Sequence, residues 1–145
     1  MGKPMIIINE DEIVGKWVGD KIGNKVPWHA YTTVGIAREG ELIGGAVIDN
    51  YILNARCSVH CAGEGINWLN RDFLSIVFHH IFKTLKCNSV INVVRGSNMA
   101  SLRFTKHIGF TEFHRTPSGS TDGSDAVWFQ MLKDECRWYK EKDKK

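Results

Sequence analysis

The sequence predicts a mixed α/β (α+β) fold, in which helices cover both faces of a mainly antiparallel central sheet. Three consecutive runs rich in β-branched and aromatic residues follow one another between residues 30 and 62, separated only by short breaks. One long segment, residues 70–86, then has apolar residues at helical spacing, and a short apolar run follows it. The length of 145 residues, with 43% hydrophobic and 24% charged residues, is typical of a single globular domain.

The charge and the apolar segments narrow the classes of function. The formal net charge is +3, but several lysines fall in the terminal run Glu141–Lys145, so the total predicts no basic face for a nucleic acid. No stretch approaches the roughly 18 to 20 apolar residues of a membrane span, and the N-terminal apolar run is too short for a signal peptide. We therefore expect a cytoplasmic protein that contacts no membrane and keeps its cysteines reduced.

The N-terminal part reads as a strand followed by a helix. Met5–Ile8 is a short apolar run, and Asn9 is placed to cap a helical segment over residues 10–23 that begins with acidic residues. On that helix we expect Ile13 and Trp17, together with Val14, to face the core.

The next segments, residues 30–38, 41–52 and 55–62, predict a meander of three antiparallel strands. Cys57 and Cys61 lie in the third strand at a spacing that resembles a metal-binding pair only on a helix. On a strand, residues i and i+4 are roughly 13 Å apart, so we predict no metal site here.

The remaining elements complete an order of strand, helix, three strands, helix, strand, helix, strand, loop and strand. The long helix begins near Asn70, and Ser89–Arg95 is a short apolar run that suits a central strand. A third helix, capped by Ser97 or Asn98, ends before Gly109. Strands at 111–117 and 126–132 then flank a polar loop. We divide the chain into a single domain, residues 1–133, and a charged tail, residues 134–145, with a solvated face.

The stretch NMASLRFTKHIGF (98–110) resembles the last helix of the GNAT family of N-acetyltransferases. That helix commonly begins with Asn, has Ala or Ser and then Ile or Leu in its first turn, and ends in Leu or Ile, Gly and Phe. The matching residues here are Asn98, Ser101, Leu102, Ile108, Gly109 and Phe110. The resemblance extends from about Ala30 to Met131.

Further residues resemble those of small GNAT-like proteins encoded by phages and prophages. In that subgroup a Trp-x-x-Arg precedes the long helix and a Cys closes it, as Trp68, Arg71 and Cys87 do here. The pairs Asp125-Ala126 and Met131-Leu132 are also similar to that subgroup.

The resemblance implies a pair of parallel strands that splay apart, one ending at Ala62 and one from Ser89 to Arg95, with acetyl-CoA in the gap. Unpaired backbone groups on the first strand would bond the pantetheine arm, and the pyrophosphate would sit at the N-terminus of the Asn70 helix. Asn98 as a plain cap and Ser101 as a small packing residue remain alternative readings. The implied cofactor-binding residues are His60, Cys61, Ala62, Asn70, Arg71, Asp72, Asn98 and Ser101.

Two positions depart from the family pattern. The pyrophosphate turn of the family is rich in glycine, whereas WLNRDF (68–73) contains none and brings Asp72 toward a doubly charged ligand. Many members also carry a tyrosine that protonates the departing thiolate, and the matching residue here is Thr105, a much weaker acid.

The family often uses a glutamate near the end of the fourth strand as the base, and Glu64 stands there. A solvated loop carboxylate is the alternative reading for Glu64. His60 is a second candidate base, with a packed sheet histidine as its alternative. Cys61 is the one cysteine placed near the splay where an acetyl-enzyme could form.

The resemblance therefore implies an acyl-CoA-dependent N-acetyltransferase, with Glu64 and Thr105 as catalytic residues and acetyl-CoA as acyl donor. Its acceptor is an unidentified amine, on a small molecule or a protein, that attacks the thioester directly. The alternative is a catalytically degenerate GNAT-like phage protein with a virion or host-interaction role, present in the virion or in the host cytoplasm. A nucleic-acid modifier would need a basic groove that the sequence does not predict, and a strand-mediated homodimer stays open.

Overall fold

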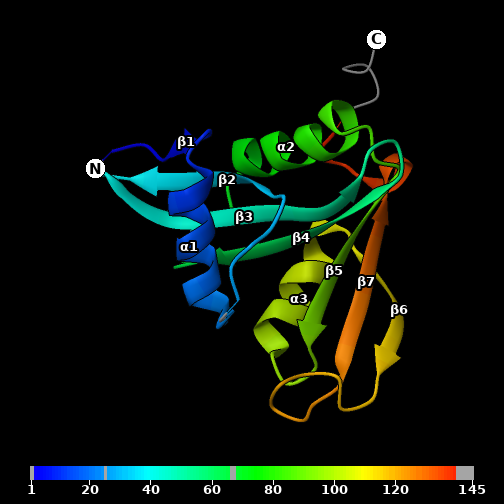
Figure 1. The fold of residues 1–145 in the computed structure, drawn as a ribbon. Coiled ribbons are helices and arrows are strands. Elements are labelled where there is room, and N and C mark those ends of the chain that lie inside the picture. The colour runs from blue at the N-terminus through cyan, green and yellow to red at the C-terminus, as the bar shows by residue number, and fades with distance from the viewer. Residues whose placement is uncertain (1, 25, 66–67, 140–145) are drawn as a thin grey trace.

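The computed structural model describes residues 2–24, 26–65 and 68–139, and its centre is one seven-stranded sheet (Figure 1). The strand order is β1-β2-β3-β4-β5-β7-β6, and every neighbouring pair is antiparallel except β4 and β5. The strands are β1 (Met5–Ile7), β2 (Thr32–Arg38), β3 (Glu41–Ile52), β4 (Arg56–Gly63), β5 (Ser89–Arg95), β6 (Thr111–Thr116) and β7 (Ala126–Leu132).

Helices cover both faces of this sheet, which confirms the predicted fold class. Side chains alternate along β3, so that Ala46 and Ile48 belong to the main hydrophobic cluster while Val47 lies in a smaller cluster on the opposite face. Helices α2 (Arg71–His79) and α3 (Met99–Ile108) contribute to the main cluster, and α1 (Asp11–Ile22) covers the smaller one. None of the described helices is long and apolar enough to cross a membrane.

Helix α1 packs closely on the sheet because a glycine lies under it. A Cβ atom added to Gly45 would lie 2.8 Å from a methyl of Val18 and 3.0 Å from one of Val14. Both valines are fully buried. The expectation that Ile13 faces the core is wrong, since its side chain is 61% exposed, and Trp17 is only partly buried. The expectation for Val14 is confirmed, and the helix is rotated so that Val14 and Val18, and not Ile13, occupy the contact.

The start of α1 also differs from the expectation. Asn9 has a left-handed φ of 62° and is not the cap, because Glu10 occupies the N-cap position without a side-chain hydrogen bond. The carboxylate of Asp11 instead accepts hydrogen bonds from the backbone N–H and the hydroxyl of Thr33, at 2.9 and 2.8 Å. Asp11 therefore ties the helix start to the outer edge of β2.

Residues 136–139, which the sequence analysis assigned to a solvated tail, pack into the main cluster. Cys136 and Tyr139 are buried, and the indole N–H of Trp138 donates to the carbonyl of Ile108 at 2.8 Å. This contact was not predicted because charged residues surround Trp138 and Tyr139 in the sequence, so the composition of the segment is that of an exposed tail. Residues 140–145 of the expected tail lie outside the described residues.

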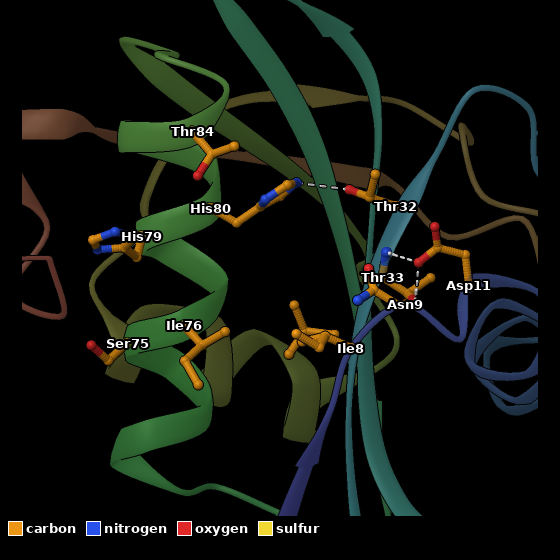
Figure 2. Close-up of a pocket in the computed structure, with 11 residues that line it drawn as sticks. Ile8, Asn9, Asp11, Thr32, Thr33, Ser75, Ile76, His79, His80 and Thr84 are labelled. Atoms are coloured by element: carbon orange, nitrogen blue, oxygen red, sulfur yellow. Dashed lines mark hydrogen bonds between the residues drawn. The ribbon is translucent and has the colours of Figure 1, made fainter.

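The apolar pattern of the long helix is borne out, since each residue expected to face the core is buried: Phe73, Leu74, Val77, Phe78, Ile81, Phe82 and Leu85. From His80 to Thr84 the helix continues as a π-helical turn. This turn borders a cavity of 520 Å³ between α2, the start of β2 and the segment before α1. Figure 2 shows His80 reaching across the cavity, where its Nε2 lies 3.0 Å from the hydroxyl of Thr32.

Burial lowers the pKa of His80 below its ordinary value, although the nearby Asp11 carboxylate acts in the opposite direction. The unfolded chain, whose histidine has an ordinary pKa of about 6.5, therefore takes up the proton first as the pH falls. The contribution of neutral His80 to stability is complete above this value and is lost as the pH decreases toward the folded-state pKa.

We expect Gly45→Ala to destabilise the fold by about 1–3 kcal/mol, because the added methyl must displace α1 from the sheet. Urea denaturation would measure this change. The control is Gly2→Ala, where the added carbon meets nothing nearer than the Glu39 side chain at 3.7 Å. Equal midpoints for Gly45→Ala and the wild type would show that α1 does not depend on this close approach.

We expect the free energy of unfolding to decrease below about pH 6.5, and His80→Gln to remove part of that decrease. Glutamine retains a donor for Thr32 but does not titrate. Denaturation midpoints measured from pH 8 to pH 5 would compare the two proteins. Parallel curves would rule out a contribution from His80.

Candidate functional site

Strands β4 and β5 are hydrogen-bonded only at their first residues, Arg56–Ser58 with Ser89–Ile91. Beyond this point β4 continues along β3 to Gly63, and β5 continues along β7 to Arg95. Each strand follows its own antiparallel neighbour, and Figure 1 shows β5 turning away from β4. Their ends therefore face a gap with backbone groups that no sheet ladder uses.

Two cavities, of 190 and 360 Å³, occupy the gap and its mouth. They form one cleft, because they share six lining residues: Ile22, Cys61, Arg95, Asn98, Ser101 and Phe104. Neither shares a lining residue with the cavity beside His80. The sequence-predicted residues His60, Cys61, Ala62, Asn98 and Ser101 all line this cleft, so the fold brings together residues from β4 and α3.

The three residues expected at the pyrophosphate turn have other contacts. The side-chain oxygen of Asn70 accepts from the backbone N–H of Asp72 and of Phe73, at 2.8 and 3.1 Å. Arg71 places its guanidinium 5.9 Å from the ring centre of Trp138. Among the described residues that line the cleft, Asn70, Arg71 and Asp72 are not found, and Asn70 itself satisfies two amides that an anion would need.

One wall of the cleft is aromatic. Trp68 lies against the end of β4 so closely that a Cβ atom on Gly63 would fall 2.1 Å from the indole ring. The ring of Phe104 on α3 is 5.0 Å from that of Trp68. Position 63 thus requires glycine, because any side chain there would collide with the Trp68 ring. Through its contact with Phe104, Trp68 connects the end of β4 to α3.

Thr105 is almost fully buried on α3 and lines the inner part of the cleft. Its hydroxyl oxygen accepts a hydrogen bond from the side-chain amide of Asn92 on β5, at 3.4 Å. Because this bond uses a lone pair of the oxygen, the hydroxyl hydrogen is available to another acceptor.

Glu64 is half-exposed and forms an ion pair with Lys21 of α1. It is not among the described residues that line the cleft, whereas Lys21 is. The carboxylate of Glu64 thus holds a cation at the cleft mouth. Its role as the base is a prediction that this geometry leaves open to experiment.

Three charged residues at or beside the cleft were not predicted from the sequence. Lys21 and Arg95 line it, and the described lining contains no carboxylate, although Glu64 pairs with Lys21 at the mouth. Asp49 lies behind it and bonds His60 at 2.8 Å. One signal in the sequence could have identified Asp49, since it is the single carboxylate in the otherwise apolar run GAVID (45–49). A charge buried in such a strand requires a partner.

Burial raises the pKa of the Cys61 thiol to about 12. The thiol therefore stays protonated at neutral pH, and a protonated thiol is a poor nucleophile. The described residues contain no group of three or more His, Cys, Asp or Glu side chains that could hold a metal ion.

The start of α3 is held by two polar contacts. Asn98 is the N-cap, and its side-chain oxygen accepts from the backbone N–H of Ser101 at 3.1 Å. Ser97 and Ser124 both donate to Asp122 in the loop between β6 and β7, and these bonds hold the pKa of that carboxyl far below its usual range. This loop therefore supports the helix end that borders the cleft.

Comparison with known proteins places the fold. No protein-family model and no curated protein sequence matches the chain. Several solved structures, however, match the chain over most of its length. The ribosomal-protein-S18-alanine N-acetyltransferase of Escherichia coli aligns with a TM-score of 0.66 at 17% identity, over 89% of this chain and 93% of its own.

Two further structures align over similar lengths. The spermidine/spermine N-acetyltransferase SpeG of Vibrio cholerae gives a TM-score of 0.70 at 12% identity, over 91% of this chain and 96% of its own. The putative acetyltransferase yncA of Salmonella typhimurium was solved with acetyl-CoA. It aligns with a TM-score of 0.70 at 14% identity, over 92% of this chain and 96% of its own. With its single parallel pair β4–β5 and its flanking helices, the chain has the fold of the GNAT acetyltransferases.

Proposed function

We propose that this protein is an N-acetyltransferase that moves the acetyl group of acetyl-CoA directly to an amine. The observation that carries the proposal is the cleft between the parted ends of β4 and β5, which is lined by basic and hydrogen-bonding side chains. Proteins of the same fold include N-acetyltransferases, and yncA, described as a putative acetyltransferase, was crystallised with acetyl-CoA.

The cleft fits the cofactor in two respects. The free edge of β4 at Cys61–Gly63 offers backbone N–H and C=O groups to an extended molecule with amide bonds, such as the pantetheine arm. Lys21 and Arg95 supply positive charge for phosphate groups, and Ser101 adds a hydroxyl. Bound there, acetyl-CoA supplies a thioester carbonyl as the electrophile.

The protein side chains favour direct attack by the amine. Cys61, the cysteine that lines the cleft, is a protonated thiol, so the amine and not an acetyl-cysteine is the acetyl acceptor. We propose that the Thr105 hydroxyl, whose hydrogen is available, donates a hydrogen bond to the sulfur that leaves. Arg95, which lines both parts of the cleft, attracts the anionic cofactor, while the charge of Lys21 is paired with Glu64.

A second candidate function rests on the start of α2. Asn70 occupies two of the amides that bind pyrophosphate in the resemblance, and the turn before them has no glycine. This arrangement favours a GNAT-like protein that no longer binds acetyl-CoA. For such a protein we propose the virion or host-interaction role that the resemblance to phage proteins implies. The two functions make opposite predictions for cofactor binding.

We expect acetyl-CoA to bind the wild-type protein, and Arg95→Glu to weaken binding about tenfold or more, equivalent to about 1.4 kcal/mol. Isothermal titration calorimetry would measure both. Arg103→Glu is the matched control, because Arg103 is exposed on α3 outside the cleft lining and makes the same change in charge. Arg71→Glu tests separately whether the α2 terminus takes part.

Absence of wild-type binding up to millimolar acetyl-CoA would refute the enzyme proposal and favour the degenerate alternative. Equal weakening by Arg95→Glu and Arg103→Glu would show a general charge effect and no specific phosphate site.

We expect Thr105→Val to lower kcat by less than about tenfold with the Kd of acetyl-CoA unchanged, because a threonine hydroxyl is a weak acid. Transfer to a peptide with an N-terminal alanine, to spermidine and to phosphinothricin would provide the assay, since these amines are named in the descriptions of structures of this fold. A changed Kd with an unchanged kcat would assign Thr105 to binding alone.

A further inference from the structure

His60 occupies the boundary between the cleft and the layer of residues under α1. It lines the inner cavity together with Cys61, and its side chain is 28% exposed. On β4 it pairs with Val47 of β3, so its side chain points to the face that α1 covers. The imidazole is thus accessible from the cleft but held from behind.

Asp49 provides the first of these contacts. It lies on the same face of β3, diagonal to His60, and its side chain is only 12% exposed. The distance from His60 Nε2 to Asp49 Oδ1 is 2.8 Å. Because a carboxylate accepts and does not donate, Nε2 carries the hydrogen of this bond. In neutral His60, Nδ1 is then the nitrogen with the free lone pair.

Trp28 provides the second contact. Its ring centre is 4.9 Å from that of His60, and its indole N–H donates to the carbonyl of Gly15 at 2.8 Å. A Cβ atom on Gly15 would fall 2.8 Å from the Tyr31 ring and 3.2 Å from that of Trp28, so this packing requires glycine. The loop before β2 is therefore anchored on α1 in a position that limits the orientation of the imidazole.

We infer that His60 is the base that removes a proton from the acceptor ammonium, and that Asp49 and Trp28 are positioning residues that fix its tautomer and orientation. This inference rests on the proposed acetyl transfer. It assigns the proton acceptor to a side chain that lines the cleft, whereas Glu64 is ion-paired with Lys21 outside the described lining. The charged and titratable groups around the pair include Cys57, which lies within electrostatic reach of Asp49, and Cys61, Lys21 and Arg95 in the cleft lining.

The chemistry balances with His60 as the single proton acceptor. The ammonium transfers one proton to Nδ1 of His60, and Asp49 stabilises the imidazolium that results. The neutral amine attacks the thioester carbonyl, so that the C–N bond forms and the C–S bond breaks. The nitrogen loses a second proton, which the departing thiolate takes up, leaving the acetamide and free CoA. His60 then returns its proton to water.

The first experiment determines the tautomer and needs no acceptor. A long-range ¹H–¹⁵N correlation spectrum of the whole protein, with His60 assigned by His60→Gln, is expected to show the Nε2–H form. Asp49→Asn is expected to reduce that form, and saturation with acetyl-CoA is expected to shift Nδ1. A wild-type His60 in the Nδ1–H form would overturn the inference, whether or not any amine reacts.

The second experiment compares transfer rates. We expect His60→Gln to lower kcat/KM at least a hundredfold while the Kd of acetyl-CoA changes less than threefold, since glutamine still donates to Asp49 but accepts no proton. We expect Asp49→Asn to lower kcat more than it changes KM, and Trp28→Phe, which loses the bond to Gly15, to have a smaller effect in the same direction. Glu64→Gln tests the competing base. His114→Gln is the matched control, because His114 is exposed on β6 outside the cleft lining, and it is expected to retain the wild-type pH optimum and kcat.

The results separate the two proposals. A wild-type rate in His60→Gln, or a hundredfold loss in Glu64→Gln alone, would overturn the assignment of the base and leave acetyl transfer intact. Absence of acetyl-CoA binding to the wild type would overturn the proposed function itself. Circular dichroism of each variant identifies loss of fold as a separate cause of low activity.

Discussion

The structure depends on one interruption in its hydrogen bonding, the end of the β4–β5 ladder after Ser58 and Ile91. Backbone groups inside a protein require partners, so an interrupted ladder is tolerated only where solvent or a ligand can replace the missing strand. The two halves of the sheet maintain the interruption, because β4 stays paired with β3 as far as Gly63 and β5 stays paired with β7 as far as Arg95. The cleft is therefore a property of the sheet topology and does not rely on a mobile loop.

The helices then give each side of the interruption its chemistry. On one side α3 places Asn98, Ser101 and Thr105 along the cleft, and its Asn98 cap contributes about 1 kcal/mol to the helix. On the other side α1 brings Lys21 and Ile22 to the mouth. The close contact of α1 with the sheet comes from Gly45 on β3 and from Val14 and Val18 on the helix. Tight van der Waals packing at these residues therefore holds the helix on the sheet.

Charge is distributed unevenly around the cleft, and this distribution separates binding from proton transfer. Arg95 and the Lys21–Glu64 ion pair lie at the mouth, where Arg95 would attract anionic phosphates, while the carboxylate of Asp49 lies behind His60. A carboxylate inside the cleft would repel the cofactor, whereas one bonded to an imidazole from behind acts on the reaction without facing the phosphates. The cavity beside His80, at the other end of α2, shares no lining residue with this arrangement.

The sequence by itself determined the features that depend on neighbouring residues: the apolar stripe of α2, the strand meander, the Asn98 cap and the αL Gly109 that ends α3. These follow from local periodicity and backbone geometry, which a single chain segment expresses. The tertiary structure decided which face of α1 is buried, that residues 136–139 join the core, and that Asp49 meets His60 while Lys21 meets Glu64. Each of these depends on strand register or helix rotation relative to the sheet, which bring together residues far apart in sequence and leave no periodic signal.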